Sequence, residues 1–302
     1  MTVEIPASDT RSSRPAVAVA DDVSQPRPRL RSSRVAVVSG ILLTITCVLM
    51  VFPFLWAALS STKPTDVAFA NPPVFRYTPT FTAYVDLWQT TDFYLYLTNT
   101  LVVAVISTLV ALVIGVPCAY ALSRYGGVAS VALLVLALVF RALPRFAVVL
   151  PMYDITRSLG IYDTTYAMAG ALIIINQPFT IWLLRNFFAD IPKELDEAAM
   201  VDGCTRVGVL TRIMVPLMGP GILTAGIFVF LFAFQEYLTA AVLTDTSSKT
   251  VPVFIATQLG QNLPLLQQAS AATVLLTLPV IGIAFIAQKY LVAGLASGAV
   301  KG

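Results

Sequence analysis

Six apolar stretches, each long enough to cross a lipid bilayer, dominate this chain of 302 residues. They lie near residues 35–59, 96–123, 128–152, 165–188, 221–244 and 269–292. A bilayer core of about 30 Å needs roughly 20 apolar residues per helix. With 57% hydrophobic and only 12% charged residues, the chain is also too apolar for a soluble domain of this length. We therefore predict an all-α, polytopic membrane protein with six transmembrane helices.

Polar residues interrupt the third and fourth of these stretches. Arg141 and Arg145 lie in the third, and Asn176, Gln177 and Pro178 lie in the fourth. Polar groups and prolines are tolerated inside a membrane where neighbouring helices satisfy them. Both stretches are therefore kept as predicted spans.

The remaining polar segments predict the domain organisation and the orientation in the membrane. Residues 1–34 are rich in Ser, Pro and Arg and are expected to form a disordered cytoplasmic tail, followed by one transmembrane domain over 35–302. The first apolar stretch is too long for a signal peptide and lacks a small-residue cleavage site at its end. Placing both termini in the cytoplasm puts thirteen Lys and Arg inside and four outside. This is the distribution that the positive-inside rule expects.

Several kinds of chemistry are excluded by residue types that are missing from the sequence. The chain has no histidine, and its three cysteines have neither metal-binding nor redox spacing. No phosphate-binding Gly-x-x-x-x-Gly-Lys-Ser/Thr stretch occurs, so the chain is not itself an ATPase. We expect no catalytic, cofactor-binding or metal-binding residues. The sequence also lacks a cluster of basic residues interleaved with aromatic residues, so it gives no indication of nucleic-acid binding. Energy for any transport must come from a partner or from a gradient.

One charged segment, residues 190–216, separates the fourth and fifth apolar stretches. Asp190 can cap a helix whose first turn contains Pro192, and Gly203 can end that helix in the left-handed conformation. Acids occupy the start of this helix at Glu194, Asp196 and Glu197, near the positive end of its dipole. These residues predict a helix of two to three turns followed by a bend. On their own they favour an interfacial helix over a docking helix.

The internal spacing of this segment resembles a known family motif. The sequence reads Glu197-Ala198-Ala199, then Gly203, Ile213 and Pro216 at fixed intervals. This pattern resembles the EAA loop of permease subunits in bacterial ATP-binding cassette (ABC) importers, with Val215 where the family usually has leucine. The segments 119–125 and 294–302 further resemble the smaller permease subunit of maltose-type carbohydrate importers.

This resemblance implies a type I ABC importer permease fold with a cytoplasmic coupling helix between transmembrane helices 4 and 5. It assigns ATPase coupling to Glu194, Glu197, Ala198, Ala199, Asp202, Gly203, Ile213 and Pro216. It also implies a second permease subunit, two cytoplasmic ATPase subunits that hold ATP and magnesium, and an extracytoplasmic sugar-binding protein. The chain itself would lie in a bacterial plasma membrane among lipids and would carry no cofactor.

Polar residues within the apolar stretches are candidates for a translocation path. We hypothesise that Arg145 pairs with Glu236 across the bundle, and that Arg141 lies one turn earlier on the same helix face. The full candidate set is Arg141, Arg145, Asn176, Gln177, Gln235, Glu236 and Tyr237. A structural ion pair and helix-bridging amides explain these residues as well as solute contact does. The family usually has Trp-Asn-Glu-Phe where this chain has Phe-Gln-Glu-Tyr, so solute specificity is not carried over.

Two alternative functions are considered from the positions of the acidic residues. A gradient-driven carrier or channel for a small polar solute would place coupling carboxylates in the membrane, and only Glu236 is available. A membrane-embedded enzyme would need acids or metal ligands gathered at one membrane face. The external acids are scattered singly, and the internal acids are concentrated in the 190–216 segment.

Overall fold

The computed structural model describes residues 33–68, 70–259 and 263–299, and every regular element in these ranges is helical. The chain divides into two compact units, Met1–Phe52 and Pro53–Gly302. Helix α1 (Ser33–Ser61) begins in the first unit and ends in the second. The predicted disordered tail lies outside the described residues, except that Ser33 and Arg34 belong to α1.

Four of the six predicted spans are single long helices, and each of the other two is divided into two shorter helices. Four helices are long and apolar enough to cross a membrane: α1, α4 (Phe93–Arg124), α7 (Thr165–Ala189) and α14 (Leu263–Ala299). The stretch at 128–152 is divided into α5 (Val128–Ala142) and α6 (Arg145–Ser158). The stretch at 221–244 is divided into α11 (Gly219–Phe234) and α12 (Leu238–Leu243). Two bent pairs of helices raise the number to six if each pair is counted as one span: α5 with α6, and residues Arg206–Leu217 with α11.

The break between α5 and α6 has a local cause in the sequence. Leu143 is extended, with φ −60° and ψ 146°, and it precedes Pro144. Proline disfavours helical backbone at the residue before it and has no N–H to continue the helix. The two helices consequently meet at 88°. The prediction that Arg141 and Arg145 share one helix face is therefore wrong, because the two residues lie on different helices.

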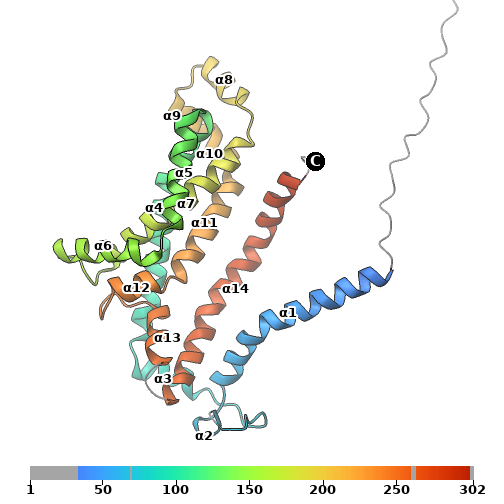
Figure 1. Cartoon of the computed structure of the whole chain (residues 1–302), viewed down its shortest axis with the longest axis vertical. Coiled ribbons are helices and arrows are strands. Elements are labelled where there is room, and N and C mark those ends of the chain that lie inside the picture. Colours follow the sequence, from blue (N-terminus) through green and yellow to red (C-terminus); the bar gives the residue numbers. More distant parts are fainter. Residues whose placement is uncertain (1–32, 69, 260–262, 300–302) are drawn as a thin grey trace, which may run out of the picture. The chain divides into compact units, whose positions relative to one another are not determined.

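Helices α4, α7 and α11 pack along one another to form the centre of the second unit (Figure 1). Buried Val103, Met168, Leu172 and Phe234 form part of the apolar core that joins them. Close approach of α4 to α7 depends on Gly115, because a Cβ there would lie 2.8 Å from the Thr180 methyl group. The three helices therefore make a tightly packed scaffold.

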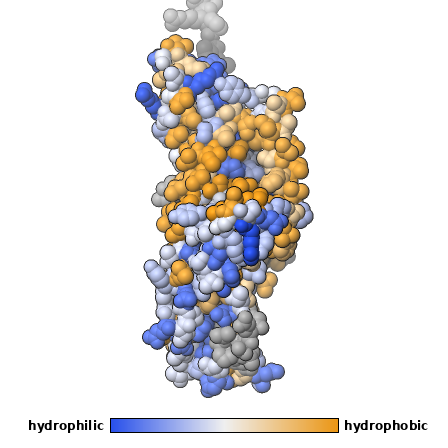
Figure 2. All heavy atoms as spheres, turned by 90° about the vertical axis from the view of Figure 1, so that its left-hand side faces the viewer, coloured by the Kyte–Doolittle hydropathy of each residue, from blue (hydrophilic) through white to orange (hydrophobic). Residues whose placement is uncertain are grey.

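Short helices lie at the two ends of this scaffold (Figure 1). At one end are α2 (Thr65–Ala68), α3 (Thr82–Thr90) and α13 (Val251–Leu259). At the other are α8 (Glu194–Val201), α9 (Arg206–Val209), a π-helix (Leu210–Met214) and α10 (Val215–Leu217). In Figure 2, hydrophobic side chains are concentrated in the upper half of the visible face, and mainly hydrophilic ones cover its lower half. The 190–216 segment thus forms one end of the helical scaffold.

Candidate functional site

Helix α8 is the helix predicted from the 190–216 segment, although it starts later than expected. It begins at Glu194 after Lys193, and Asp190 lies instead at the end of α7. The prediction that Asp190 caps α8 is therefore wrong. Pro192 contributes to this outcome, because its ring disfavours helical backbone at the residue before it.

The end of α8 fits the predicted glycine stop. Gly203 has φ +85°, a backbone conformation that residues with a Cβ rarely adopt. Its N–H donates to Met200 O at 3.1 Å, and the N–H of Cys204 donates to Ala199 O at 3.0 Å. These paired bonds form a Schellman motif, which satisfies the last carbonyl groups of the helix. The prediction that Gly203 ends the helix in the left-handed conformation is confirmed.

A buried ion pair attaches α8 to the end of α4. Arg124 Nε lies 2.7 Å from Asp196 Oδ2, and each side chain is only 8% exposed. The other carboxylate oxygen, Asp196 Oδ1, accepts a hydrogen bond from the Tyr120 hydroxyl at 2.5 Å. Breaking such a pair leaves an uncompensated buried charge, which costs about 3–5 kcal/mol. Asp196 is therefore the main polar link between α8 and the scaffold.

Arg124 also contacts the neighbouring helix ends. Its Nη1 donates to the carbonyl oxygens of Phe188 and Ile191, each at 3.1 Å. Its Nη2 lies 3.7 Å from the sulfur of Met214 in the π-helix. One guanidinium thus joins the ends of α4 and α7 to both α8 and the segment that leads into α11. Sequence reasoning missed this role, because Arg124 and Tyr120 entered it only through the resemblance of segment 119–125 and, for Arg124, through the count of basic residues.

The two sides of α8 differ in what they contact. Asp196 and Ala199 are buried against the scaffold. The opposite side is exposed and consists of Glu194, Leu195, Glu197, Ala198 and Val201. Val201 is 87% exposed, an unusual environment for a β-branched apolar side chain. The two adjacent alanines therefore face different ways: Ala199 packs inward and Ala198 is available to a partner.

The rest of the 190–216 segment bends back toward the scaffold. Thr205 caps α9 by accepting a hydrogen bond from the N–H of Gly208 at 3.2 Å. The wider π-turn precedes Pro216, which has no N–H and whose ring would clash with the carbonyl group of Arg212 in a regular helix. Ile213 packs against the core beneath this turn, whereas Pro216 is exposed. A bend of 78° then leads into α11.

Arg145 and Glu236 lie near each other, as hypothesised, but their contact is loose. Arg145 Nη2 is 3.8 Å from Glu236 Oε2, and the arginine side chain is 40% exposed. Glu236 lies in the turn between α11 and α12, where its Oε1 accepts from the N–H and the hydroxyl of Thr239 at 3.1 and 2.8 Å. Glu236 therefore caps α12 as well as facing Arg145. Its neighbours Gln235 and Tyr237 are exposed.

Substitutions at Glu236 should separate these two contributions. We expect Glu236→Gln to change the free energy of unfolding by less than about 1 kcal/mol. The ion pair is long and its arginine is solvent-exposed, and an amide oxygen can still accept from Thr239. Glu236→Ala should cost about 1 kcal/mol more through loss of the cap. Thermal unfolding of the purified chain in detergent measures both effects. Equal destabilisation by the two substitutions would show that the ion pair, not the cap, dominates.

Of the two side-chain amides predicted to lie in the fourth span, Gln177 contacts another helix and Asn176 is buried. Gln177 Nε2 donates to Ala111 O on α4 at 3.4 Å. Asn176 is 2% exposed, so it is buried within the second unit. Of the two explanations left open by the sequence, the position of Gln177 agrees with helix bridging.

A different acid, Asp163, organises the segment that follows α12. Its carboxylate accepts hydrogen bonds from four consecutive backbone N–H groups, at distances of 2.8–3.1 Å. The donors are Asp245, Thr246, Ser247 and Ser248, which we call the 245–248 loop. The hydroxyl groups of Ser247 and Ser248 also donate to this carboxylate. Burial raises the pKa of Asp163, but these hydrogen bonds outweigh it and hold the pKa well below its ordinary value.

Helix α4 holds the same loop from its other side. Asn99 Nδ2 donates to Ser247 O and Lys249 O at 3.0 and 3.1 Å. Thr100 Oγ1 accepts from the N–H of Val251 at 2.9 Å. The connection between α12 and α13 is thus fixed to two other parts of the scaffold. Sequence reasoning counted Asp163 only as a scattered external acid.

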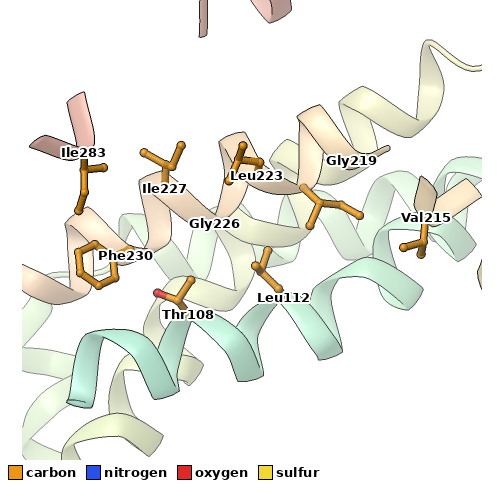
Figure 3. Close-up of a pocket in the computed structure, with 10 residues that line it drawn as sticks. Thr108, Leu112, Val215, Gly219, Leu223, Gly226, Ile227, Phe230 and Ile283 are labelled. Atoms are coloured by element: carbon orange, nitrogen blue, oxygen red, sulfur yellow. The ribbon is translucent and has the colours of Figure 1, made fainter. Parts of the chain in front are cut away.

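An apolar groove of about 510 Å³ lies between α4, α11 and α14 (Figure 3). Leu112, Leu223, Ile227, Phe230 and Ile283 provide much of its lining. Its one side-chain hydroxyl belongs to Thr108 and donates to the backbone oxygen of Ala104 at 2.7 Å. A polar solute would find no free side-chain donor there. The groove is therefore separate from the charged residues at the α5–α6 break.

The long and bent apolar helices around a packed scaffold fit a protein that crosses a membrane several times. The chain belongs to the family described as binding-protein-dependent transport system inner membrane component, which matches residues 111–297. It is therefore an ABC transporter permease, a non-catalytic inner-membrane subunit. No group of metal-ligating side chains occurs among the residues that the structure describes.

Individual relatives cover nearly the whole chain. The probable ABC transporter permease protein y4oR of Sinorhizobium fredii is 37% identical over 83% of this chain and 90% of its own length. The trehalose/maltose transport system permease protein MalG of Thermococcus litoralis is 34% identical over 88% of this chain and 96% of its own. A chain of a bacterial ABC transporter that imports the acidic polysaccharide alginate has a TM-score of 0.72. It is 24% identical and covers 88% of this chain and 99% of its own, which shows a shared ABC importer permease fold.

Proposed function

We propose that this chain forms half of the translocation path of an ATP-driven saccharide importer and that α8 couples it to an ATPase. The family and the names of the relatives support a permease of this class. A second permease subunit, two ATPase subunits that hold ATP and magnesium, and an extracytoplasmic sugar-binding protein complete the complex. Both chain termini lie in the cytoplasm, which places α8 on the same side as the ATPases.

The observation that carries this proposal is the two-sided construction of α8. One side is anchored by the buried Arg124–Asp196 pair. The other side presents Glu197, Ala198 and Val201 to solvent. An exposed apolar residue flanked by acids suits a cleft that has an apolar floor and basic edges. Because Arg124 joins α8 to the ends of α4 and α7 and to the segment that leads into α11, movement of a docked ATPase would be transmitted to these three helices together.

The candidate path residues are proposed to act near the far end of α5 and α11. Arg141, Arg145 and Glu236 are ionisable groups within apolar stretches. Such groups face the interior of a helix bundle or a water-filled cavity rather than lipid. Gln235 and Tyr237, both exposed, extend this polar surface. Asn176 and Gln177 support it from α7 through helix contacts.

The coupling assignment is tested by Glu197→Lys in the assembled importer. Glu197 is exposed and forms no ion pair among the described residues, so the substitution should leave unfolding temperature and assembly unchanged. Reversing its charge should lower ATP-dependent uptake into proteoliposomes by at least tenfold, about 1.4 kcal/mol of coupling free energy. Asp154→Asn, at another exposed acid, is the control. Normal uptake by Glu197→Lys would contradict docking through this side of α8.

A further inference from the structure

The break between α5 and α6 brings together more positive than negative charge. Arg141 lies in the last turn of α5 and Arg145 begins α6. Both line one cleft with Phe140, Leu143, Val148 and Ile175. Glu236 faces Arg145 at 3.8 Å. Arg141 forms no ion pair with any residue in the described ranges. Only one of the two guanidinium groups therefore faces a carboxylate, and that carboxylate also caps α12.

Aromatic rings hold the Arg141 guanidinium in place without neutralising it. Its central carbon lies 4.9 Å from the Phe179 ring centroid and 5.1 Å from that of Phe232. Such cation–π contacts attract a guanidinium group without removing its charge. The Nη1 atom is nevertheless buried without a hydrogen-bond partner in the described part of the chain. Arg141 thus retains an unused donor and an unbalanced charge.

The size of the cleft limits what can enter it. Its volume is about 20 Å³, which admits about one water-sized group. A carboxylate, sulfonate or phosphate oxygen fits this space, whereas a sugar ring does not. Guanidinium groups bind such oxygens through paired, charge-assisted hydrogen bonds. Phe232 and Trp182, each 37% exposed, both contact the Phe179 ring and provide flat apolar surface for an attached ring.

We propose that the Arg141–Arg145 cleft receives one anionic group of the transported saccharide, so that the solute is an acidic sugar. The inference rests on the proposed importer function and names the substrate class of its path. A phospholipid headgroup offers the same chemistry from a different source. The excess charge lies beside aromatic rings that suit a sugar, which favours the solute as the source.

Binding of a matched pair of probes tests this assignment. The assembled importer in phosphatidylcholine nanodiscs is titrated with radiolabelled D-glucuronate and D-glucose, which differ in one carboxylate. Glucuronate is expected to bind at least tenfold more tightly, and Arg141→Gln and Arg145→Gln should each weaken it at least tenfold. Arg141→Lys, which keeps the charge but loses the planar fork, should show an intermediate loss. Arg157→Gln is the control, because Arg157 also lies over two rings, Tyr153 and Tyr162.

Three results would overturn the assignment. These are equal binding of the two probes, no binding of glucuronate, and an equal loss for both probes in Arg141→Gln. A lipid source is separated by adding phosphatidylglycerol and by mass spectrometry of copurified lipid. Displacement of glucuronate, with lipid retained by the wild type and lost in Arg141→Gln, would assign the cleft to a headgroup instead. ATP-dependent uptake that remains sensitive to Glu197→Lys would show that the importer function stands even if this inference fails.

Discussion

Replacing Asp196 by asparagine is expected to remove most ATP-dependent uptake and to destabilise the chain by about 3–5 kcal/mol. The substitution preserves size but leaves Arg124 charged and buried, with its carboxylate partner gone. Because α8 buries only Asp196 and Ala199, little else holds it against the scaffold. Thermal unfolding in detergent and uptake into proteoliposomes measure the two effects.

A compensating pair provides the sharper form of this experiment. Arg124→Met combined with Asp196→Leu removes both charges and should recover much of the stability lost in either single variant. Uptake should stay low in the double variant, because Phe188 O and Ile191 O lose Arg124 Nη1, the donor that joins the end of α7 to α4. Asp154→Asn should change stability by no more than about 0.5 kcal/mol. Full uptake in Asp196→Asn would contradict a coupling role for the anchor.

Replacing Asp163 by asparagine should cost about 1–3 kcal/mol, because one carboxylate serves the whole 245–248 loop. Asn tolerates the positive φ of this residue, 55°, so the substitution isolates the charge from the backbone conformation. Ser248→Ala removes one hydroxyl donor and should cost less. Thermal unfolding of the three proteins gives the order, and a larger loss in Ser248→Ala would contradict this role for the carboxylate.

The contribution of Asp163 should also depend on pH in a defined direction. Its pKa in the folded chain is lowered, so the stabilisation is fully present above the unfolded value of about 3.9. It is lost as pH falls below about 4 toward the folded value. The difference in unfolding free energy between wild type and Asp163→Asn should therefore be constant from pH 7 to about 5 and shrink at lower pH. A difference that grows on acidification would have the wrong sign.

The sequence was sufficient for the fold class because membrane helices are set by the length of apolar runs. It was also sufficient for the end of α8, since Gly203 is a local signal. The break at Leu143 was available from Pro144 but was overruled by the apolar length of the stretch. The start of α8 was misplaced because Asp190 and Pro192 satisfy a capping pattern that the end of α7 makes unnecessary.

Contacts between distant residues could be predicted only where charge left few choices. Arg145 and Glu236 were matched because Glu236 is the only acid within the apolar stretches. Asp196 had several possible basic partners, and its pairing with Arg124 depends on how α4 and α7 end beside each other. Asp163 bonds mostly to backbone N–H groups, which no side-chain pattern reveals.

The opposed sides of α8 have a consequence for how such importers diversify. Substitutions at Glu194, Glu197, Ala198 or Val201 change solvent-exposed positions and leave the Asp196 anchor intact. A duplicated copy of this gene could therefore acquire a different ATPase by drift on those positions while its folding remained under separate selection. Inward substitutions would be removed first, since they fail before any new partner is met.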